Sequence, residues 1–169
     1  MLAKSETRDN WRSRTKGLGI HSNLTCNTIE LPISSPYEPG GTGVVLSQTM
    51  APHVIRMRKD KVGLGRWAWT RLRGKERVIT IISAYRPCKP STTGVQTLYV
   101  QHARSLSVNQ EPRQQFLVDL KECIQAHQVQ SDMIILGMDL NDPAQRYDLT
   151  KYFEELNIKE EIQSIHRGK

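Results

Sequence analysis

The sequence predicts a single α/β domain, and three observations support this prediction. A chain of 169 residues with 37% hydrophobic content is long enough for one ordinary globular core. Runs rich in β-branched and aromatic residues follow one another in the middle of the chain, which is typical of consecutive strands of a sheet. An amphipathic helical pattern and then an uninterrupted apolar run come after them. We therefore expect strands and helices around one core.

The predicted strands follow a region that is rich in Ser, Thr, Asn and Pro. This region, residues 17–41, contains strong turn signals, and we expect it to form a long surface loop. Strands are then expected at residues 43–48, 53–58, 66–73 and 77–85. In the third run Trp67, Trp69 and Arg71 share one face, because side chains alternate along a strand. That face is predicted to be aromatic and basic.

Helices and one further strand are expected in the second half of the chain. A short helix is predicted at residues 98–106, and a clearer one begins near Glu111, with Pro112 in its first turn and apolar residues at helical spacing. Residues 133–137 are an apolar run of the kind that is buried on both faces of a sheet. A final helix is expected at residues 149–156, before a polar tail.

Charge and composition restrict the classes of partner and compartment. The net charge of +7 favours polyanions such as nucleic acid, because Lys and Arg neutralise phosphates and release their counterions. The sequence has neither a long apolar run nor a basic amphipathic helix, so no membrane partner is expected. Cys26, Cys88 and Cys123 lack the spacing of a zinc site or a disulfide framework, and no secretory signal is visible. We expect an intracellular protein, cytoplasmic or nuclear, of undetermined oligomeric state.

Polar side chains gather where the apolar run ends. Asp139 and Asn141 are two residues apart and have the same parity, so both side chains can point toward a phosphate, a hard cation or its water ligands. The alternative is that the pair only organises a turn. The sequence therefore gives a candidate catalytic pair that also has a plausible structural role.

Four short motifs, in their order along the chain, resemble the endonuclease/exonuclease/phosphatase family. Glu6-Thr7 lies near the start, Gly40-Gly41 opens a strand, Tyr85 ends a strand within Ala-Tyr-Arg-Pro, and Asp139 follows another within Gly-Met-Asp-Leu-Asn. In the family a metal-binding Glu element, a Gly-Gly strand, an Ala-Tyr-x-Pro strand end and a Gly-x-Asp-x-Asn strand end occur in the same order. The strand at residues 64–69 is most similar to members carried by retroelements.

The resemblance implies a fold, a cofactor and a set of roles. The expected fold is a layered α/β sandwich with two packed, mostly antiparallel sheets and outer helices. By position, Glu6 would ligate Mg²⁺ or Mn²⁺, Tyr85 would lie beside the scissile phosphate, Asp139 would orient or activate water, and Asn141 would help to hold the phosphate. Such a site hydrolyses a phosphodiester by in-line attack of water. The expected substrate is nucleic acid, with DNA ahead of RNA.

The sequence also departs from the family pattern. The family uses an Asn on a strand before the Glu element and, near its C-terminus, an Asp and an Asp-His pair, whereas His166 of this chain follows Ile165. We therefore expect residues 1–169 to form one partial family domain with an incomplete C-terminal half. Two functions stay open: a metal-dependent endonuclease-type hydrolase, and a non-catalytic remnant that binds nucleic acid through its basic surface.

A basic and aromatic part of the chain is expected to contact nucleic acid. Basic side chains follow the phosphates of a nucleic acid, and bases stack on aromatic rings. The candidate contacts are Arg66, Trp67, Trp69, Arg71, Arg73 and Arg86. The alternative is a solvated strand face whose tryptophans are turned into the core.

Overall fold

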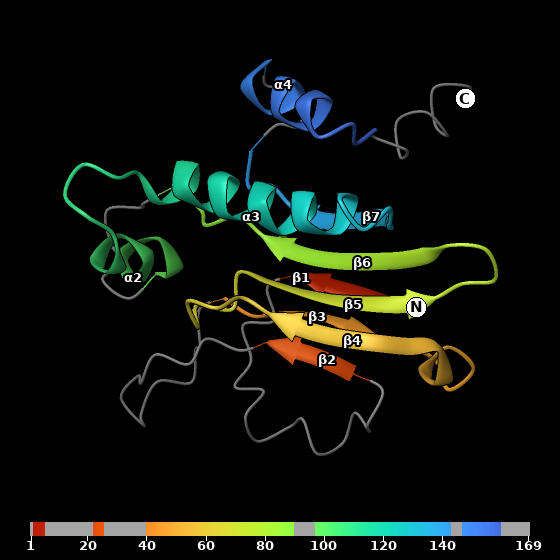
Figure 1. Ribbon diagram of the computed structural model, residues 1–169. Helices are drawn as coiled ribbons and strands as arrows, with labels where there is room; N and C mark the ends of the chain where they lie inside the picture. The colour runs from red at the N-terminus through yellow and green to blue at the C-terminus, as the bar shows by residue number, and fades with distance from the viewer. Residues whose placement is uncertain (1, 6–21, 26–39, 90–96, 143–146, 160–169) are drawn as a thin grey trace, which may run out of the picture.

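Two sheets lie against each other in a computed structural model of the chain, and helices cover the outer face of the larger sheet (Figure 1). The structure describes residues 2–5, 22–25, 40–89, 97–142 and 147–159. This arrangement confirms the predicted α/β sandwich. No helix in these ranges is long and apolar enough to cross a membrane.

The larger sheet has four strands in the order β4-β5-β6-β7. They are β4 (Val54–Lys59), β5 (Trp67–Arg73), β6 (Val78–Tyr85) and β7 (Met133–Asp139). Strands β4, β5 and β6 pair antiparallel, whereas β6 and β7 are parallel. A parallel neighbour requires a crossover connection. Here the connection contains helices α2 (Leu98–Ser105) and α3 (Pro112–Gln128). Because β6 and β7 are parallel, both strands end at the same edge of the sheet.

The smaller sheet and the helices complete the layers. Its strands are antiparallel in the order β1-β3-β2, namely β1 (Leu2–Ser5), β3 (Thr42–Val45) and β2 (Ser22–Thr25). The helices are α2 (Leu98–Ser105), α3 (Pro112–Gln128) and α4 (Tyr147–Glu155), and a short 3-10 turn, η2 (Ala51–His53), precedes β4. Helix α3 begins as expected: the Glu111 carboxylate accepts a hydrogen bond from the Gln114 N–H at 2.7 Å, and Pro112 occupies the first turn.

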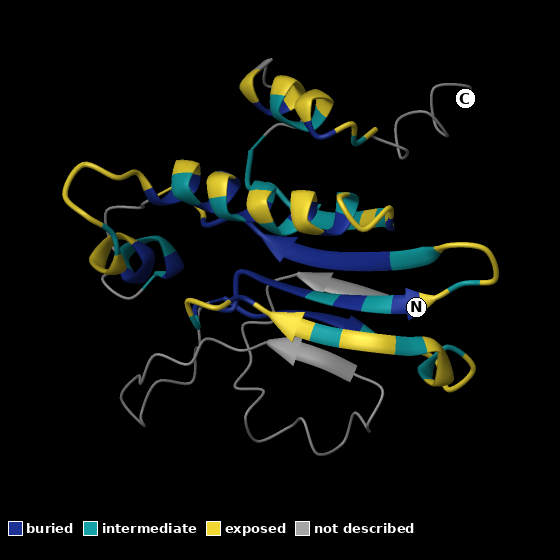
Figure 2. Ribbon diagram, in the orientation of Figure 1, coloured by how far each residue is buried: buried dark blue, intermediate teal, exposed yellow. Residues whose placement is uncertain are grey.

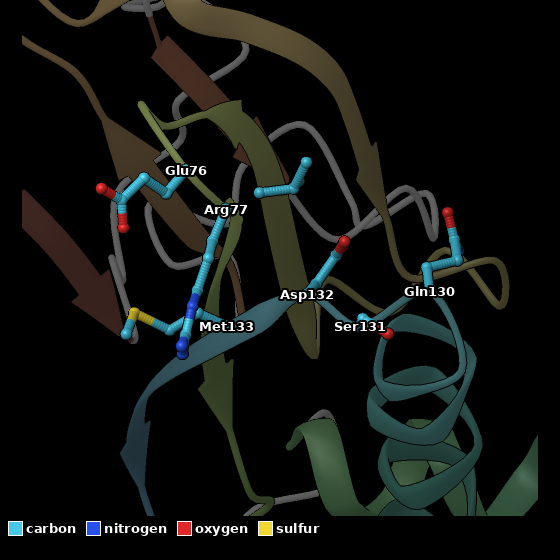
Figure 3. Close-up of a pocket in the computed structure, with 7 residues that line it drawn as sticks. Glu76, Arg77, Gln130, Ser131, Asp132 and Met133 are labelled. Atoms are coloured by element: carbon cyan, nitrogen blue, oxygen red, sulfur yellow. The ribbon is translucent and has the colours of Figure 1, made fainter.

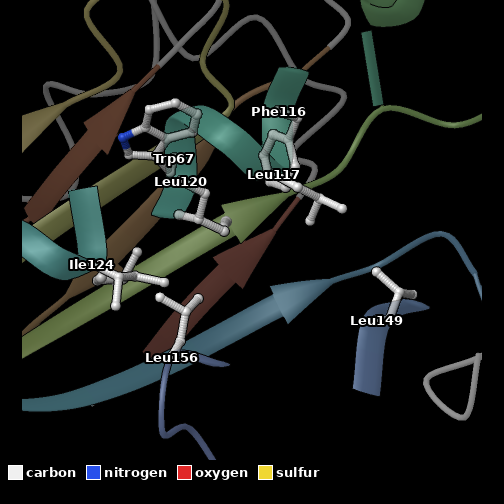
Figure 4. Packing of buried hydrophobic residues seen from close by; sticks show 9 residues of the cluster. Trp67, Phe116, Leu117, Leu120, Ile124, Leu149 and Leu156 are labelled. Carbon is white, nitrogen blue, oxygen red and sulfur yellow. The ribbon is translucent and has the colours of Figure 1, made fainter. Parts of the chain in front are cut away.

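Two apolar layers hold the structure together, one on each face of the larger sheet. On the outer face α3 contributes Phe116, Leu120 and Ile124, and the Trp67 ring meets Phe116 edge to face at 5.8 Å (Figure 4). On the inner face, toward the smaller sheet, the buried residues are Val44, Leu46, Leu72 and Ile81. The apolar stripe predicted for α3 therefore faces a core, as its helical spacing indicated.

Strand β7 differs from the prediction for residues 133–137. The apolar run forms a strand, but β7 is an edge strand of the larger sheet, and Met133 and Ile135 keep 47% and 43% of their surface exposed. The expectation of burial on both faces is therefore wrong. The physical reason is that an apolar run shows that a strand is hydrophobic but does not show how many layers of structure cover it. Among the described elements, little covers the inner face of β7.

The predicted surface loop at residues 17–41 also needs correction. Strand β2 lies inside it, and Gly40 and Gly41 are buried beside the larger sheet. Gly40 has φ +84°, and a Cβ at this position would lie 2.7 Å from the carbonyl oxygen of Leu64, so only glycine fits. The other residues of the predicted loop lie outside the described ranges.

Candidate functional site

The candidate site lies where the parallel strands β6 and β7 end. Tyr85 and Asp139 are register partners in this pair, and the Arg86 backbone N–H donates to the Asp139 carbonyl oxygen at 2.9 Å. Paired residues of neighbouring strands project to the same face of a sheet. Since Ile82 and Ala84 point into the outer core, Tyr85 belongs to the inner face, and so does its partner Asp139.

Tyr85 is held firmly at this edge. Its side chain is 3% exposed and packs with Leu64 and Leu98. Its hydroxyl oxygen lies 3.1 Å from the Sγ atom of Cys88, in the segment that follows β6. The ring is therefore a core residue, and the hydroxyl brings a polar atom to the end of the strand.

Asp139 and Asn141 form a turn directly after β7. The Asn141 backbone N–H donates to Asp139 Oδ1 at 3.0 Å, and Asn141 has φ 48°, a left-handed conformation that asparagine tolerates well. The Asn141 amide nitrogen donates to the Arg86 carbonyl oxygen at 2.6 Å. The pair thus has the structural role that the sequence left as an alternative. In the described part of the chain, nothing donates a hydrogen bond to Asp139 Oδ2 or Asn141 Oδ1.

A buried ionic lock fixes the segments after β6 and β7 relative to each other. Arg113, in the first turn of α3, donates to the carbonyl oxygens of Pro87 at 2.6 Å and Asn141 at 3.3 Å. It also forms an ion pair with Asp142, which accepts a second hydrogen bond from Arg86 at 3.1 Å. These three ionic side chains are at most 5% exposed. We refer to Arg86, Arg113 and Asp142 as the ionic lock.

The sequence reasoning missed two members of this lock. Asp142 directly follows the motif that ends in Asn141, but Arg113 lies near the start of a helix, 29 residues before Asp142. Neither position has a pattern that pairs it with the other. Arg86, which was expected to contact nucleic acid, is 2% exposed and is used inside the lock.

The oxygen atoms of the site suit a hard divalent cation. Mg²⁺ prefers carboxylate and amide oxygens and retains several waters, and Asp139 Oδ2 and Asn141 Oδ1 are oxygens of this kind. Among the residues that the structure describes, no group of three or more His, Cys, Asp or Glu side chains gathers to hold a metal ion. Glu6 lies outside the described ranges. Asp139 and Asn141 therefore fit Mg²⁺ or Mn²⁺ as part of a site that needs at least one further ligand.

Two other candidate nucleic-acid contacts are buried. Arg66 is completely buried, and its guanidinium group pairs with Asp60 at 2.8 Å and with Asp119 at 2.7 Å. Trp67 is 7% exposed and packs in the outer core. The expectation of surface contacts is corrected for Arg66, Trp67 and Arg86, because each arginine has a buried carboxylate partner and the tryptophan ring is covered by α3.

The remaining candidates lie nearer the surface. Trp69 is half-buried and meets the His127 ring edge to face at 4.4 Å. Arg71 is half-buried and donates two hydrogen bonds of 2.7 Å to the Asp132 carboxylate. Arg73 is exposed. Trp69, Arg71 and Arg73 therefore stay candidates for nucleic-acid contact.

A second polar cluster lies at the opposite end of the sheet, around Asp132. Its carboxylate accepts hydrogen bonds from Arg71 and, at 2.7 Å, from the Thr80 hydroxyl, and His127 Nδ1 lies 3.3 Å away. Burial raises the pKa of Asp132, but these hydrogen bonds, with that of Arg71 the largest, outweigh it and lower the pKa below the ordinary value. The cluster borders a surface hollow of about 570 Å³ (Figure 3). Because its carboxylate is already saturated with donors, we assign Asp132 a structural role.

Comparison with known proteins identifies the fold. No protein-family model and no curated protein sequence matches the chain. Among solved structures, beta toxin from Staphylococcus aureus matches with a TM-score of 0.50 and 11% identity, over 88% of this chain and 53% of the toxin chain. SmcL matches with a TM-score of 0.43 and 14% identity, over 73% of this chain and 41% of the other.

A retrotransposon endonuclease domain is also similar. The endonuclease domain of TRAS1, a telomere-specific non-LTR retrotransposon, matches with a TM-score of 0.42 and 13% identity, over 82% of this chain and 54% of that domain. The chain shares the fold of beta toxin. At these identities the likeness concerns the fold alone, and the chain spans about half the length of the solved structures it matches.

Proposed function

We propose that the chain is a divalent-metal-dependent phosphodiester hydrolase domain of the endonuclease/exonuclease/phosphatase type, related to retroelement endonucleases and acting on nucleic acid. One observation carries the proposal: Tyr85, Asp139 and Asn141, which the family motifs select from distant parts of the sequence, lie together at the ends of β6 and β7. A chance set of motifs would have no reason to meet at one edge of a sheet.

Each residue has a role that its contacts allow. Asp139 uses Oδ1 to hold the turn, so its Oδ2 is available to orient a water molecule or to ligate a cation. Asn141 is oriented by its hydrogen bond to the Arg86 carbonyl oxygen and presents its Oδ1 and its second amide hydrogen. Glu6 would add a carboxylate ligand. Bound Mg²⁺ or Mn²⁺ would neutralise charge on the phosphodiester as water attacks.

Nucleic acid is the substrate class that the charge distribution favours. The buried carboxylates of Asp60, Asp132 and Asp142 form ion pairs with arginines. These buried acidic side chains therefore do not neutralise the basic side chains on the surface. In the described part of the chain, exposed basic side chains add to the positive charge of the surface; they include Arg56, Arg58, Lys59, Lys61 and Arg73. A polyanion is the complementary partner, and within this class we propose DNA ahead of RNA. The proposal implies an intracellular site of action.

A second candidate function is nucleic-acid binding without cleavage. The exposed basic residues of β4 favour it, since Lys and Arg side chains bind phosphates without any hydrolytic machinery. Both candidates predict binding, and they differ only in whether the site at Asp139 breaks a phosphodiester bond.

The nicking of supercoiled plasmid DNA in Mg²⁺ separates the two candidates. The wild-type protein is compared with Asp139→Asn and with Glu122→Gln, a matched control that removes one carboxylate from the exposed surface of α3. Hydrolysis predicts Mg²⁺-dependent nicking by the wild type and by Glu122→Gln, and none by Asp139→Asn. Binding with no nicking by any of the three proteins contradicts the hydrolase proposal and supports the binding function.

A further inference from the structure

Strand β4 is one edge of the larger sheet, and β7 is the other. Strand β4 carries a row of exposed basic residues. Figure 2 shows most of this strand exposed, unlike the neighbouring β5 and β6. Arg56, Arg58 and Lys59 lie on the strand, and Lys61 follows it. We call these four residues the β4 strip.

The four residues do not all lie on one face of the sheet. Arg56 is the register partner of Arg71, and Arg58 that of Trp69, so both share the outer face with the partly buried Trp69, whose ring contacts His127 of α3. Lys59 is the register partner of Ala68 and projects to the inner face, the face of Asp139. The strip thus has positive charges on both faces of an edge strand and a neighbouring aromatic side chain on the outer one.

The charges of the strip are not neutralised by the acidic residue in its midst. Asp60 separates Lys59 from Lys61, but its carboxylate is buried and turned toward Arg66, with contacts of 2.8 and 3.0 Å. Arg56, Lys59 and Lys61 form no ion pair with any residue in the described ranges. Arg56, Lys59 and Lys61 therefore present positive charge to solvent.

Protection of a sheet edge is the simplest explanation of such charges, since basic residues on an edge strand prevent pairing with other chains. Among the described strands β7 is the other edge, and it has no charged residue from Met133 to Met138. Edge protection and phosphate contact make different predictions for DNA affinity, which the experiment below separates.

The end of the strip at Lys59 and Lys61 is placed to follow a nucleic acid that reaches the candidate site, because it lies at the same end of the sheet and Lys59 projects to the same face as Asp139. Lys59 belongs to the cross-strand row that continues through Ala68 and Ser83 to Gly137, two residues before Asp139. Neighbouring strands are about 4.8 Å apart, so β4 lies roughly 14 Å from β7. One strand of a duplex has a phosphate about every 3.4 Å along the axis, so this distance corresponds to about four nucleotides.

We propose that the β4 strip contacts the phosphate backbone of nucleic acid, about four nucleotides from the phosphate that lies at Asp139. The proposal rests on the proposed function for its substrate. It moves the contact surface away from the buried Arg66, Trp67 and Arg86 and onto an edge strand. Backbone contact of this kind positions the substrate without reading its sequence.

The experiment measures the affinity for a fluorescent DNA duplex at several NaCl concentrations, in EDTA so that no cleavage occurs. The strip variant is Lys59→Gln with Lys61→Gln. The matched control is Lys75→Gln with Arg77→Gln, which removes the same charge from the exposed turn between β5 and β6. Thermal melting of each variant checks that it is folded, and Lys59→Gln serves as a second, single-site variant.

The proposal predicts a roughly tenfold loss of affinity for the strip variant and a decrease of about 1.8 in the magnitude of the salt slope, or 0.9 for each lost phosphate contact. The salt slope of Lys59→Gln should decrease by about half as much, and the salt slope of the control variant should equal that of the wild type. Equal losses in strip and control variants would show that only net charge matters and would overturn the proposal, as would no loss in either. The affinity is measured without cleavage and with the wild-type residue at Asp139, so a failure of the hydrolase proposal and a failure of the strip remain distinguishable.

Discussion

Tyr85 and Asp139 face the same side of the larger sheet as direct partners in the parallel pair of β6 and β7. This relationship depends on register, because a slip of one residue between the strands would send Asp139 to the opposite face. The ionic lock of Arg86, Arg113 and Asp142 lies immediately beyond both strands and opposes such a slip.

Removing the Tyr85 hydroxyl should affect function more than stability. Tyr85→Phe keeps the buried ring and loses only the oxygen that lies 3.1 Å from Cys88 Sγ. We expect the free energy of unfolding to change by about 1 kcal/mol or less, the usual net value of one hydrogen bond, while plasmid nicking falls by an order of magnitude or more. Urea unfolding and nicking rates measure the two effects. Unchanged nicking would remove Tyr85 from the site.

Breaking the ionic lock should destabilise the protein strongly. Asp142→Asn leaves Arg86 and Arg113 buried without their shared carboxylate, and loss of one partner of a buried pair costs about 3–5 kcal/mol. Glu155→Gln, which breaks the exposed pair with Lys121, is the control and should leave the unfolding midpoint unchanged. Similar midpoints for the two variants in urea unfolding would show that the lock is not buried as described.

The buried imidazole of His102 should make the protein less stable in acid. Its side chain is 1% exposed, its Nε2 accepts a hydrogen bond from Arg66 at 3.0 Å, and burial together with the charge of Arg66 lowers its pKa to about 4. Below about pH 6.5 the imidazole of His102 is protonated in the unfolded chain, whereas in the folded protein it stays neutral until the pH falls to about 4. Above pH 6.5 the titration of His102 therefore does not change the free energy of unfolding. As the pH falls from 6.5 to about 4 it lowers the free energy of unfolding progressively, and below about pH 4 this effect levels off.

Unfolding of His102→Gln between pH 7 and 4 measures this contribution. The slope of stability against pH should flatten by up to about 1.4 kcal/mol per pH unit relative to the wild type. A residual slope of the same sign is expected from His127, because burial lowers its pKa as well. His53→Gln, at an exposed histidine, is the control for the substitution itself. A wild-type slope in His102→Gln would mean that His102 is not buried as a neutral base.

Two isoleucines that are register partners on one face of the sheet should differ in their contribution. Ile81 is 1% exposed between the two sheets, whereas Ile135 on the edge strand β7 is 43% exposed. We expect Ile81→Ala to cost about 2–5 kcal/mol and Ile135→Ala about 1 kcal/mol. Chemical unfolding of both variants at low protein concentration gives the comparison. Equal costs would show that the inner face of β7 is covered in solution.

The sequence predicted local structure well, because local structure depends on nearest neighbours. The β-branched runs gave β4, β5 and β6 to within one or two residues, and the spacing of Phe116, Leu120 and Ile124 gave the buried face of α3. The ends of β6 and β7 were also predicted to carry the candidate site, since polar residues directly follow them.

The sequence could not predict which charges are buried. Arg66 pairs with Asp60, six residues earlier, but also with Asp119, 53 residues later, and Arg113 pairs with Asp142, 29 residues later. A nearby carboxylate such as Asp60 does not by itself distinguish a buried arginine from exposed ones such as Arg56 and Arg58, which also lie close to it in the sequence. This is why the expected nucleic-acid contacts included Arg66, which lies inside the fold. The burial of β7 was overestimated for a related reason: the layers around a strand are set by distant parts of the chain.

The most direct test of a metal site at the ends of β6 and β7 is the effect of Mn²⁺, a paramagnetic substitute for Mg²⁺, on the amide signals of the folded protein in solution. We expect broadening that is confined to residues 85–89 and 139–142 within the described ranges, that excess Mg²⁺ reverses, and that Asp139→Asn abolishes. Broadening elsewhere, or broadening that persists in Asp139→Asn, would contradict a metal-dependent phosphodiesterase site at the ends of β6 and β7.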